Sequence, residues 1–398
     1  MQTTSGSPTV PEGRRTTPFV AAGGLVGGRL RISAKVLPGQ ARPHNRALIL
    51  QTLYRDGTQS RADLARSTGL TRVTVSDLVA DLLADGLVAE VGPRGGSRPG
   101  KPATLLEFSR DASHIVGIDL SDHSLFRGAV LDLGGQVLSR AEVELDGATG
   151  TDALERVATL VAGLLGQAGR RVLGIGVGSP GIVDLAGVVM SAPNLGWHDL
   201  NLRAALEERF SLPVVVANDA NVAVLAEHSF GGASEDTLLV KIGHGVGAGL
   251  LLGGSPVIGS RFAAGEVGHV VVDEPGGGQC ACGKTGCLET WLATARLTAA
   301  LEEAGTAADR EVVLARAGQV LGRALAPIVG ALNISEIVLS GPAELLEGRL
   351  SAATIEAIRL RTLAELHGDL ELRMTALGDE IVTRGAAALV LTQQLGIS

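Results

Sequence analysis

Three cysteines and one histidine lie close enough in the sequence to form a metal site. Cys280, Cys282 and Cys287 are the only cysteines among the 398 residues, and they fall within eight residues of each other. A disulfide would leave one of them over, and cytosolic thiols mostly stay reduced. Tetrahedral zinc needs four ligands, and His269 is the nearest histidine in sequence. We therefore expect a structural zinc; three reduced, unliganded cysteines are the alternative.

A second group of polar residues could bind a ligand rich in hydroxyl groups. Asn218 and Asp219 follow a predicted strand at residues 214–217, and side chains beyond the carboxyl end of a strand point into a crevice. The loop from Gly178 to Gly181 follows another predicted strand and would let a ligand approach the backbone. Taken alone, the Asn-Asp pair is equally typical of a helix cap, and the glycine loop of an ordinary turn.

These residues carry a resemblance to a known family. Glu266-Val-Gly-His269, ten residues, then Cys280-x-Cys-Gly-x-x-Gly-Cys-x-Glu289 resembles the signature of the ROK family of repressors, open reading frames and kinases. The resemblance covers roughly residues 43 to 395. It implies that the zinc loop, residues 266–289, braces a sugar site. The sugar contacts that we expect on this basis are Asn218, Asp219, Glu266, His269 and Glu289, with Gly181 beside them.

The resemblance raises the question of kinase activity. It places Asp219 at the position of the catalytic base, but the loops that would bind ATP depart from the family pattern. Asp-x-Gly-Gly-Thr is replaced by Asp119-Leu-Ser-Asp-His123, Gly-Thr-Gly by Gly243-His-Gly245, and Gly-Gly by Gly341-Pro342. Asp122 also puts a negative charge where a phosphate should approach bare backbone. We therefore predict no enzyme and no catalytic residue, with a vestigial base at Asp219. An active ATP-dependent sugar kinase with a DNA-binding domain is the alternative.

Residues 43–110 have the pattern of a winged helix-turn-helix. Ser60 and Thr71 are good helix N-caps, and Gly86 is typical of a helix end. The apolar residues of the third helix, Val73 among them, should face the first two helices. The expected elements are helices at residues 47–54, 61–67 and 72–85 and strands at residues 87–91 and 103–108.

The same segment has the chemistry of a DNA-binding domain. Residues 1–110 hold 15 Lys and Arg against 8 Asp and Glu, a net charge of +7, whereas the rest of the chain, with 19 against 34, has a net charge of -15. The segment also resembles the amino-terminal domain of ROK repressors; a winged fold that binds protein is the alternative. The start of the third helix would enter the major groove and the proline-flanked wing the minor groove. The expected DNA contacts are Thr71, Arg72, Thr74, Ser76, Arg98 and Lys101.

The remaining chain alternates strands and helices, which predicts an α/β fold. The resemblance adds that residues 111–398 form a two-lobed actin-like ATPase (ribonuclease H-like) sugar-kinase fold. Residues 1–42 have no sustained period, and we expect a disordered tail. The expected helices are at residues 153–168, 202–210, 220–229, 288–303, 311–332, 350–366 and 380–394, and the expected strands at 114–119, 126–131, 137–144, 173–179, 214–217, 237–242, 247–252, 336–339 and 370–374.

Together these features predict a sugar-responsive transcriptional regulator, in particular a repressor. Its expected partners are double-stranded operator DNA, a monosaccharide or related effector, and further copies of the chain in a homodimer or dimer of dimers. We expect no membrane span, because no apolar run approaches about 18 residues, and we expect the cytoplasm as its location. A zinc-dependent scaffolding protein without sugar or DNA is a third reading, which the set of sugar contacts disfavours.

Overall fold

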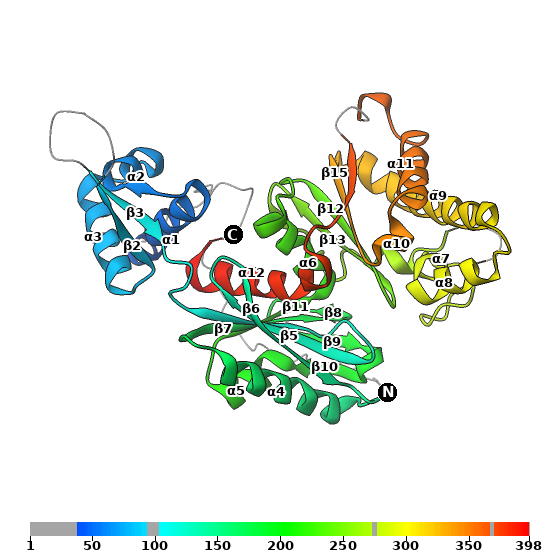
Figure 1. Ribbon diagram of the computed structural model, residues 1–398, viewed down its shortest axis with the longest axis horizontal. Helices are drawn as coiled ribbons and strands as arrows, with labels where there is room; N and C mark the ends of the chain where they lie inside the picture. Colours follow the sequence, from blue (N-terminus) through cyan, green and yellow to red (C-terminus); the bar gives the residue numbers. More distant parts are fainter. Residues whose placement is uncertain (1–37, 94–102, 273–276, 367–369, 398) are drawn as a thin grey trace, which may run out of the picture.

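The computed structural model describes residues 38–93, 103–272, 277–366 and 370–397. The wing residues Arg98 and Lys101 and residues 1–37 of the predicted tail lie outside these ranges. Figure 1 shows a small helical domain at the start of the chain, joined to a larger part built on two five-stranded sheets.

The small domain has the predicted order of three helices and a hairpin. Ser60 caps the second helix in a capping box with Asp63, and Thr71 caps the third by accepting a hydrogen bond from the N–H of Thr74, as predicted. The three strands pair in the order β1-β3-β2. The elements are α1 (Pro38–Asp56), β1 (Gln59–Ser60), α2 (Arg61–Thr68), α3 (Arg72–Ala84), β2 (Val88–Pro93) and β3 (Thr104–Phe108).

Two expectations for this domain are wrong. Helix α1 begins at Pro38, so residues 38–42 are helical rather than part of a disordered tail. Arg42 of α1 pairs with Asp81 of α3, and Arg46 pairs with Asp85, the C-cap residue of α3; sequence periodicity does not reveal such contacts. Val73 does not face the other helices but is 71% exposed, because it lies off the stripe formed by Val75, Leu78, Val79 and Leu82.

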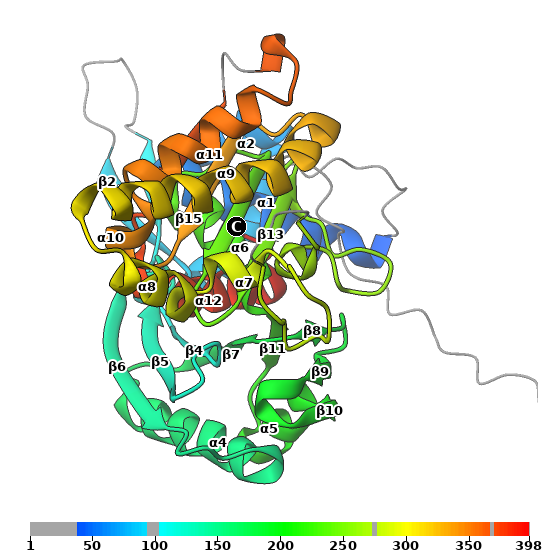
Figure 2. The same ribbon diagram turned by 90° about the vertical axis from the view of Figure 1, so that its right-hand side faces the viewer.

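The first large sheet has the strand order β11-β7-β4-β5-β6. Helices α4 and α5 cover one face and α12 the other, as Figures 1 and 2 show. A three-stranded sheet, β10-β9-β8, extends this lobe and was not predicted. The elements are β4 (His114–Asp119), β5 (Leu125–Asp132), β6 (Val137–Glu144), α4 (Gly150–Gln167), β7 (Val172–Ser179), β8 (Ile182–Val183), β9 (Val188–Ala192), the 3₁₀ turn η1 (Pro193–Leu195), β10 (Trp197–Asn201), α5 (Leu202–Phe210) and β11 (Val214–Asn218).

The second large sheet has the order β14-β13-β12-β15-β16. Leu238 and Val240 of β12 point into the core shared with α9, and Leu239 points into the core shared with α6. The elements are α6 (Asp219–Ala226), the π-helix η2 (Glu227–Gly231), β12 (Thr237–Ile242), β13 (Val246–Leu252), β14 (Ser255–Pro256), η3 (Val267–His269), α7 (Glu289–Leu292), α8 (Thr294–Glu303), α9 (Ala307–Leu332), β15 (Glu336–Ser340), α10 (Ala343–Leu346), α11 (Arg349–Arg359), η4 (Ala364–Leu366), β16 (Glu371–Met374), η5 (Gly378–Glu380) and α12 (Ile381–Leu395).

Three predicted helices end or break earlier than expected. The helix expected at 288–303 breaks at Ala293, because the N–H of Thr294 donates to the carbonyl of Gly243 instead of continuing the helix. The helix expected at 220–229 becomes a π-helix from Glu227 onward. The helix expected at 350–366 ends at Arg359, and the 3₁₀ turn η4 follows it.

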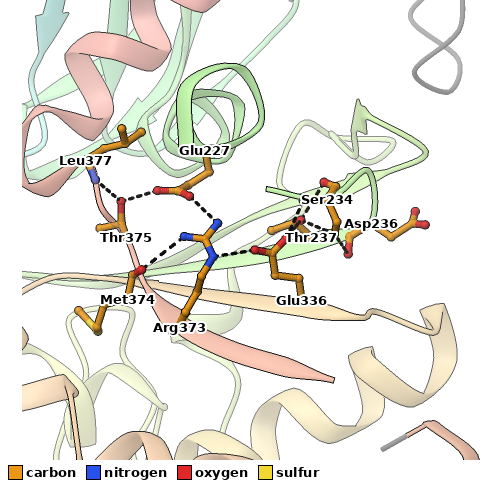
Figure 3. Close-up of polar contacts among 9 residues, drawn as sticks. All are labelled: Glu227, Ser234, Asp236, Thr237, Glu336, Arg373, Met374, Thr375 and Leu377. Atoms are coloured by element: carbon orange, nitrogen blue, oxygen red, sulfur yellow. Dashed lines mark hydrogen bonds and ion pairs between the residues drawn. The ribbon is translucent and has the colours of Figure 1, made fainter. Parts of the chain in front are cut away.

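A buried polar network fixes the end of α6 against β15 and β16 (Figure 3). The carboxylate of Glu227, which is fully buried, accepts hydrogen bonds from Arg373 at 2.8 Å and from the Thr375 hydroxyl. Arg373 also donates to Glu336 at 2.8 Å. Gly231 lets this carboxylate fit, because a Cβ there would lie 2.4 Å from Glu227 Oε2. The network is centred on the residue at which the helix changes to π geometry.

Helix α12 links the three parts of the molecule. It packs against α6 between the two large sheets. Its C-terminal end leads toward α1, so that the C-terminus of the chain lies beside the small domain (Figure 1). Gly396 lies so close to Ala47 that a Cβ on the glycine would be 2.7 Å from the alanine Cβ. Leu391 and Ile397 belong to the same buried cluster as the core of the small domain, which therefore continues into the body of the protein.

One described helix, α9, passes the length and composition test for a membrane span. Half of its most apolar window is buried, and Val320, Leu321 and Leu325 form part of the core beneath the second large sheet. The buried half of its apolar residues therefore packs within the protein.

Candidate functional site

The cysteines and histidine predicted to bind metal come together in space. Cys280 Sγ lies 3.5 Å from His269 Nδ1, and Cys282 Sγ lies 3.6 Å from Cys287 Sγ. All four donor atoms lie within 4.8 Å of one another. Sulfur ligands about 2.3 Å from a tetrahedral zinc are separated by about 3.8 Å, so the arrangement fits such an ion. The four donors would complete its coordination and leave no position for a substrate.

A small hairpin holds these donors. The N–H of Cys280 donates to the carbonyl of Lys284, and Cys287 pairs with Val271 in an isolated antiparallel bridge. Burial raises the pKa of Cys287 to about 12, whereas the N–H of Lys284 lowers the pKa of Cys282 to about 7. The thiols therefore differ strongly in acidity, and a bound cation would be needed to hold all three as thiolates.

The zinc loop ends directly at a carboxylate. Glu289, the first residue of α7, lies 3.8 Å from Cys280 Sγ through Oε1 and accepts a hydrogen bond from the N–H of Val246 through Oε2. The metal loop and β13 thus fix this side chain from two sides. His269 faces Cys280 through Nδ1, so its Nε2 is the nitrogen left for a ligand.

Glu266 belongs to the same cluster of charges. Burial raises its pKa; His269 lowers it in part, and the carboxylates of Asp219 and Glu289 raise it further. The structure therefore brings together four of the predicted sugar contacts, all of them half-buried. Half-buried carboxylates that can accept several hydrogen bonds are suited to the hydroxyl groups of a sugar.

Asn218 has a clear structural role in addition to its predicted one. Its Oδ1 caps α6 by accepting from the N–H groups of Ala220 and Asn221, and its Nδ2 donates to the carbonyl of Gly181 at 2.9 Å. Gly181 has a φ of +80°, and a Cβ there would lie 2.0 Å from the carbonyl oxygen of Ser191. The packing against β9 by itself accounts for the glycine.

Asp219 is held from two sides. Its Oδ2 lies 3.0 Å from the ammonium of Lys241 on β12, and its Oδ1 accepts from Asn218 Nδ2 at 3.2 Å. Burial would lower the pKa of Lys241, but the carboxylates of Asp219 and Asp119 raise it, so the lysine stays charged. Asp219 therefore faces a permanent cation.

Two of the three loops that depart from the kinase pattern lie against each other. Asp122 and His123 lie in the turn between β4 and β5, and His244 lies in the turn between β12 and β13. The rings of His123 and His244 are 3.6 Å apart between centroids. Asp122 accepts hydrogen bonds from Ser124 and Arg127. Charged and aromatic side chains from the two turns thus lie together at this point.

The predicted recognition helix presents most of its predicted contacts. Thr71, Arg72 and Ser76 are exposed at the start of α3, whereas Thr74 is half-buried and its hydroxyl lies 2.9 Å from that of Thr71. The hydroxyl of Thr71 is also occupied, because it accepts the hydrogen bond that caps α3. Arg72 and Ser76 are therefore the freest of the four to reach a base edge.

Comparison with known proteins identifies the larger part of the chain. Residues 115–393 match the model of the ROK family. The chain belongs to the ROK family. Residues 43–99 match a MarR family model, which agrees with the winged helix-turn-helix of the small domain. The two large lobes accordingly have the actin-like sugar-kinase fold of ROK proteins.

ROK proteins of two kinds are similar to this chain. The xylose repressor of Caldicellulosiruptor bescii is 27% identical over 88% of this chain and 96% of its own length. A solved ROK transcriptional regulator, a homolog of the E. coli MLC protein, has 25% identity and a TM-score of 0.78, covering 90% of this chain and 98% of that one. A ROK glucokinase from Streptomyces griseus, solved with glucose and AMPPNP, has 25% identity and a TM-score of 0.61. The match covers 70% of this chain and 99% of the glucokinase.

The sequence analysis of this ROK protein missed one residue and misplaced another. Lys241 is a charged residue within the otherwise apolar strand Thr237–Ile242, and that contrast is the signal that could have drawn attention to it. Val73 was assigned to the core, although its offset from the apolar stripe of α3 indicates exposure.

Proposed function

We propose that this ROK protein is a sugar-responsive, DNA-binding transcriptional repressor. The DNA-binding domain comprises residues 43–110 and the sugar-binding domain residues 111–398. Asp219, Glu266, His269 and Glu289 bind hydroxyl groups of an aldose in the cleft, and Asn218 positions Asp219. Relatives that are named repressors support this assignment over the scaffolding alternative.

In this proposal zinc has a structural role. His269, Cys280, Cys282 and Cys287 would hold the ion, which supplies charge neutralisation for the thiolates and a fixed orientation for the loop. The ring of His269 keeps Nε2 toward the sugar, and the loop keeps Glu289 against Val246. The geometry and the donor chemistry of the four side chains support the choice of zinc.

We further propose that the protein has no kinase activity. The ammonium of Lys241 occupies one oxygen of Asp219, the residue at the position of the base. Asp122 adds a negative charge beside the position of the phosphates, and His123 and His244 fill the space around it. These features favour a ligand-binding carboxylate over a general base.

The observation that carries the proposal is the continuous packing from the sugar site to the DNA-binding domain. Asp219 is the first residue of α6, α6 packs along α12, and α12 shares a buried core with α1. A sugar that closes the cleft would shift α6 and α12, and with them the winged domain. In a dimer two recognition helices must reach successive major grooves about 34–36 Å apart. A small shift therefore releases DNA, with a coupling of about 1–3 kcal/mol.

The test combines three measurements on the full chain. Operator DNA is first selected from a random pool, and gel shifts then follow binding with and without each aldose of a panel that includes D-xylose and D-glucose. Calorimetry measures the sugar affinity, and a coupled assay with ATP measures phosphorylation. We expect one aldose to bind, to weaken operator binding about 5- to 150-fold and to remain unphosphorylated. Failure to bind DNA, or turnover of ATP with the bound aldose, would refute the proposal.

A further inference from the structure

A second cluster of metal-ligating side chains lies away from the cysteine loop. It consists of Asp122, His123 and His244, whose ligand atoms all lie within 4.8 Å of one another. Two of the three come from the β4–β5 turn of the first lobe, and the third comes from the β12–β13 turn of the second. The cluster thus joins two sheets that are separate in the fold, and neither turn has all three ligands alone.

The distances within the cluster suit a small cation. Asp122 Oδ1 lies 3.6 Å from His123 Nδ1 and 3.8 Å from His244 Nε2. Ligands about 2.0–2.1 Å from a tetrahedral metal are separated by about 3.3 Å, so shifts of a few tenths of an ångström would bring these atoms into place. His123 and His244 are 61% and 50% exposed in their side chains, so they can make such shifts without disturbing the core.

The carboxylate at the centre is already oriented. The N–H and hydroxyl of Ser124 donate to Asp122 Oδ1 at 2.8 and 2.7 Å, and Arg127 donates to Oδ2 at 3.1 Å. Hydrogen bonds of this kind to a ligating carboxylate are usual around protein-bound metals.

The two imidazoles face the same carboxylate oxygen. His123 Nδ1 and His244 Nε2 lie 3.6 and 3.8 Å from Asp122 Oδ1, and the ring centroids are 3.6 Å apart. Contacts of 3.6–3.8 Å are too long for good hydrogen bonds. Hydrogen bonding among the three groups therefore does not account for their arrangement.

We propose that Asp122, His123 and His244 bind one divalent transition-metal cation, zinc or a metal of similar preference, between the two lobes. Two imidazoles and one carboxylate favour such an ion, whereas Mg²⁺ and Ca²⁺ prefer oxygen ligands. Three protein ligands leave at least one coordination position open toward solvent. The positive charges of Arg127 and Lys241 oppose the ion and the carboxylate of Asp119 favours it, so we expect weaker binding than in the cysteine loop.

The consequence of this site is a bridge across the interlobe cleft. The turn that carries His244 is anchored by Glu289 at Val246 and by Thr294 at Gly243. A metal that ties this turn to Asp122 and His123 would hold the lobes together on the side where nucleotide phosphates bind in a kinase of this fold. The proposal rests on these side chains alone and does not require the sugar or DNA assignment.

The test uses Co²⁺ as the probe, because the two metal sites then differ in colour. The full chain is stripped of metal, reloaded with Co²⁺ and freed of unbound ion by gel filtration, and the bound metal is counted by elemental analysis. A cysteine site gives intense thiolate-to-cobalt charge-transfer absorption, whereas a site of nitrogen and oxygen ligands gives only weak visible bands. His123→Ala and His244→Ala are compared with His198→Ala, which changes an exposed histidine of β10 far from the cluster in sequence.

We expect two equivalents of Co²⁺ in the wild type and in His198→Ala. His123→Ala and His244→Ala should each keep one equivalent together with the full charge-transfer absorption. Excess Mg²⁺ should displace neither ion. If either variant fails to fold by circular dichroism, Asp122→Asn takes its place with the same expectation. One equivalent in the wild type, or two equivalents that persist in both histidine variants, would overturn the proposal.

Discussion

The ammonium of Lys241 lies 3.0 Å from the carboxylate of Asp219, at the N-terminus of helix α6. The two residues come from different lobes, since Asp219 follows β11 of the first sheet and Lys241 lies on β12 of the second. The buried Asp119 is a further negative group beside the lysine, and burial raises the pKa of Asp119 despite that cation. The pair thus forms a charged contact between the two lobes.

Asp219→Asn should separate sugar binding from DNA binding. The change keeps the size of the side chain but removes a charge-assisted hydrogen bond worth about 1.5–3 kcal/mol, so sugar affinity should fall roughly 10- to 150-fold. Operator binding without sugar should be unchanged, because α3 is not altered. Calorimetry and gel shifts on the same preparation provide the measurement. Asp199→Asn is the matched control, since Asp199 is exposed with a φ of +49°, which asparagine tolerates. Unchanged sugar affinity in Asp219→Asn would remove this residue from the site.

Cys282→Ser should remove the metal of the cysteine loop. With one thiolate gone, the remaining donors should fail to retain a stoichiometric zinc through gel filtration, as elemental analysis can determine. Sugar affinity should fall by about tenfold or more, because the loop positions both His269 and Glu289. Thr285→Ser, in the same hairpin but not a ligand, is the control. Full zinc retention in Cys282→Ser would contradict the assignment of its ligands.

Val73→Ala tests the exposed face of the recognition helix. An apolar side chain there can contact a thymine methyl group, so operator affinity should fall by about 1 kcal/mol or more without a loss of thermal stability. Arg72→Ala should weaken operator binding by about 1–3 kcal/mol and relax sequence specificity. Lys101→Ala should mainly reduce the slope of log affinity against log salt concentration, by about one unit. Val312→Ala, at an exposed valine of α9, controls for the loss of surface methyl groups. If all the variants bind the operator like the wild type, α3 is not the recognition surface.

Arg373→Met should destabilise the protein strongly. The change leaves the carboxylates of Glu227 and Glu336 without their cation, and Glu227 is fully buried (Figure 3). Removal of one partner from a buried ion pair costs about 3–5 kcal/mol. Arg209→Met is the control, because Arg209 pairs with Glu155 on the surface and such pairs contribute about 0–1 kcal/mol. Denaturant unfolding measures both, and equal effects would show that the network is not a stabilising element.

Glu336→Gln should make the free energy of unfolding fall less steeply as the pH is lowered. Burial would raise the pKa of Glu336, but hydrogen bonds from Ser234, Arg373 and Thr237 hold it below its usual value of 4.5. The folded state therefore binds fewer protons, so this contribution is fully present above about pH 4.5 and is lost as the pH falls through the lower, folded pKa. Unfolding free energies measured between pH 6 and acid should decrease less steeply in the variant than in Glu302→Gln, an exposed control on α8. Equal slopes would contradict the contribution of Glu336.

Local sequence signals predicted the elements whose own residues determine them. The caps at Ser60 and Thr71, the long apolar strands and the crowded cysteines could all be read directly, and the structure agrees with them. The helix break at Ala293 could not be read, because its cause is a hydrogen bond from Thr294 to Gly243, about fifty residues away in the chain. The short strands β8, β9 and β10 were not predicted for a related reason. They are stabilised by pairing with each other, and their own composition gives little indication of a strand.

The candidate site divides in the same way. The spacing of Cys280, Cys282 and Cys287 predicts a shared metal ion, and the structure brings their sulfur atoms together. The contact between Lys241 and Asp219 and the cluster around Asp122 depend on how the two lobes face each other. No local pattern records that arrangement. Sequence reasoning recognised Asp122 and His244 as departures from a pattern but not as neighbours.

The shared core of α1 and α12 also bears on how the chain is made. The DNA-binding domain emerges from the ribosome early, whereas the helix that covers its inner face is synthesised only after both lobes. Until α12 arrives, the apolar surface around Ile49 and Leu53 lacks part of its packing. An incomplete translation product that ends before α12 would therefore carry a recognition helix on a weakened scaffold. We expect such a fragment to bind its operator less firmly than the full chain, because part of the core around α1 is missing.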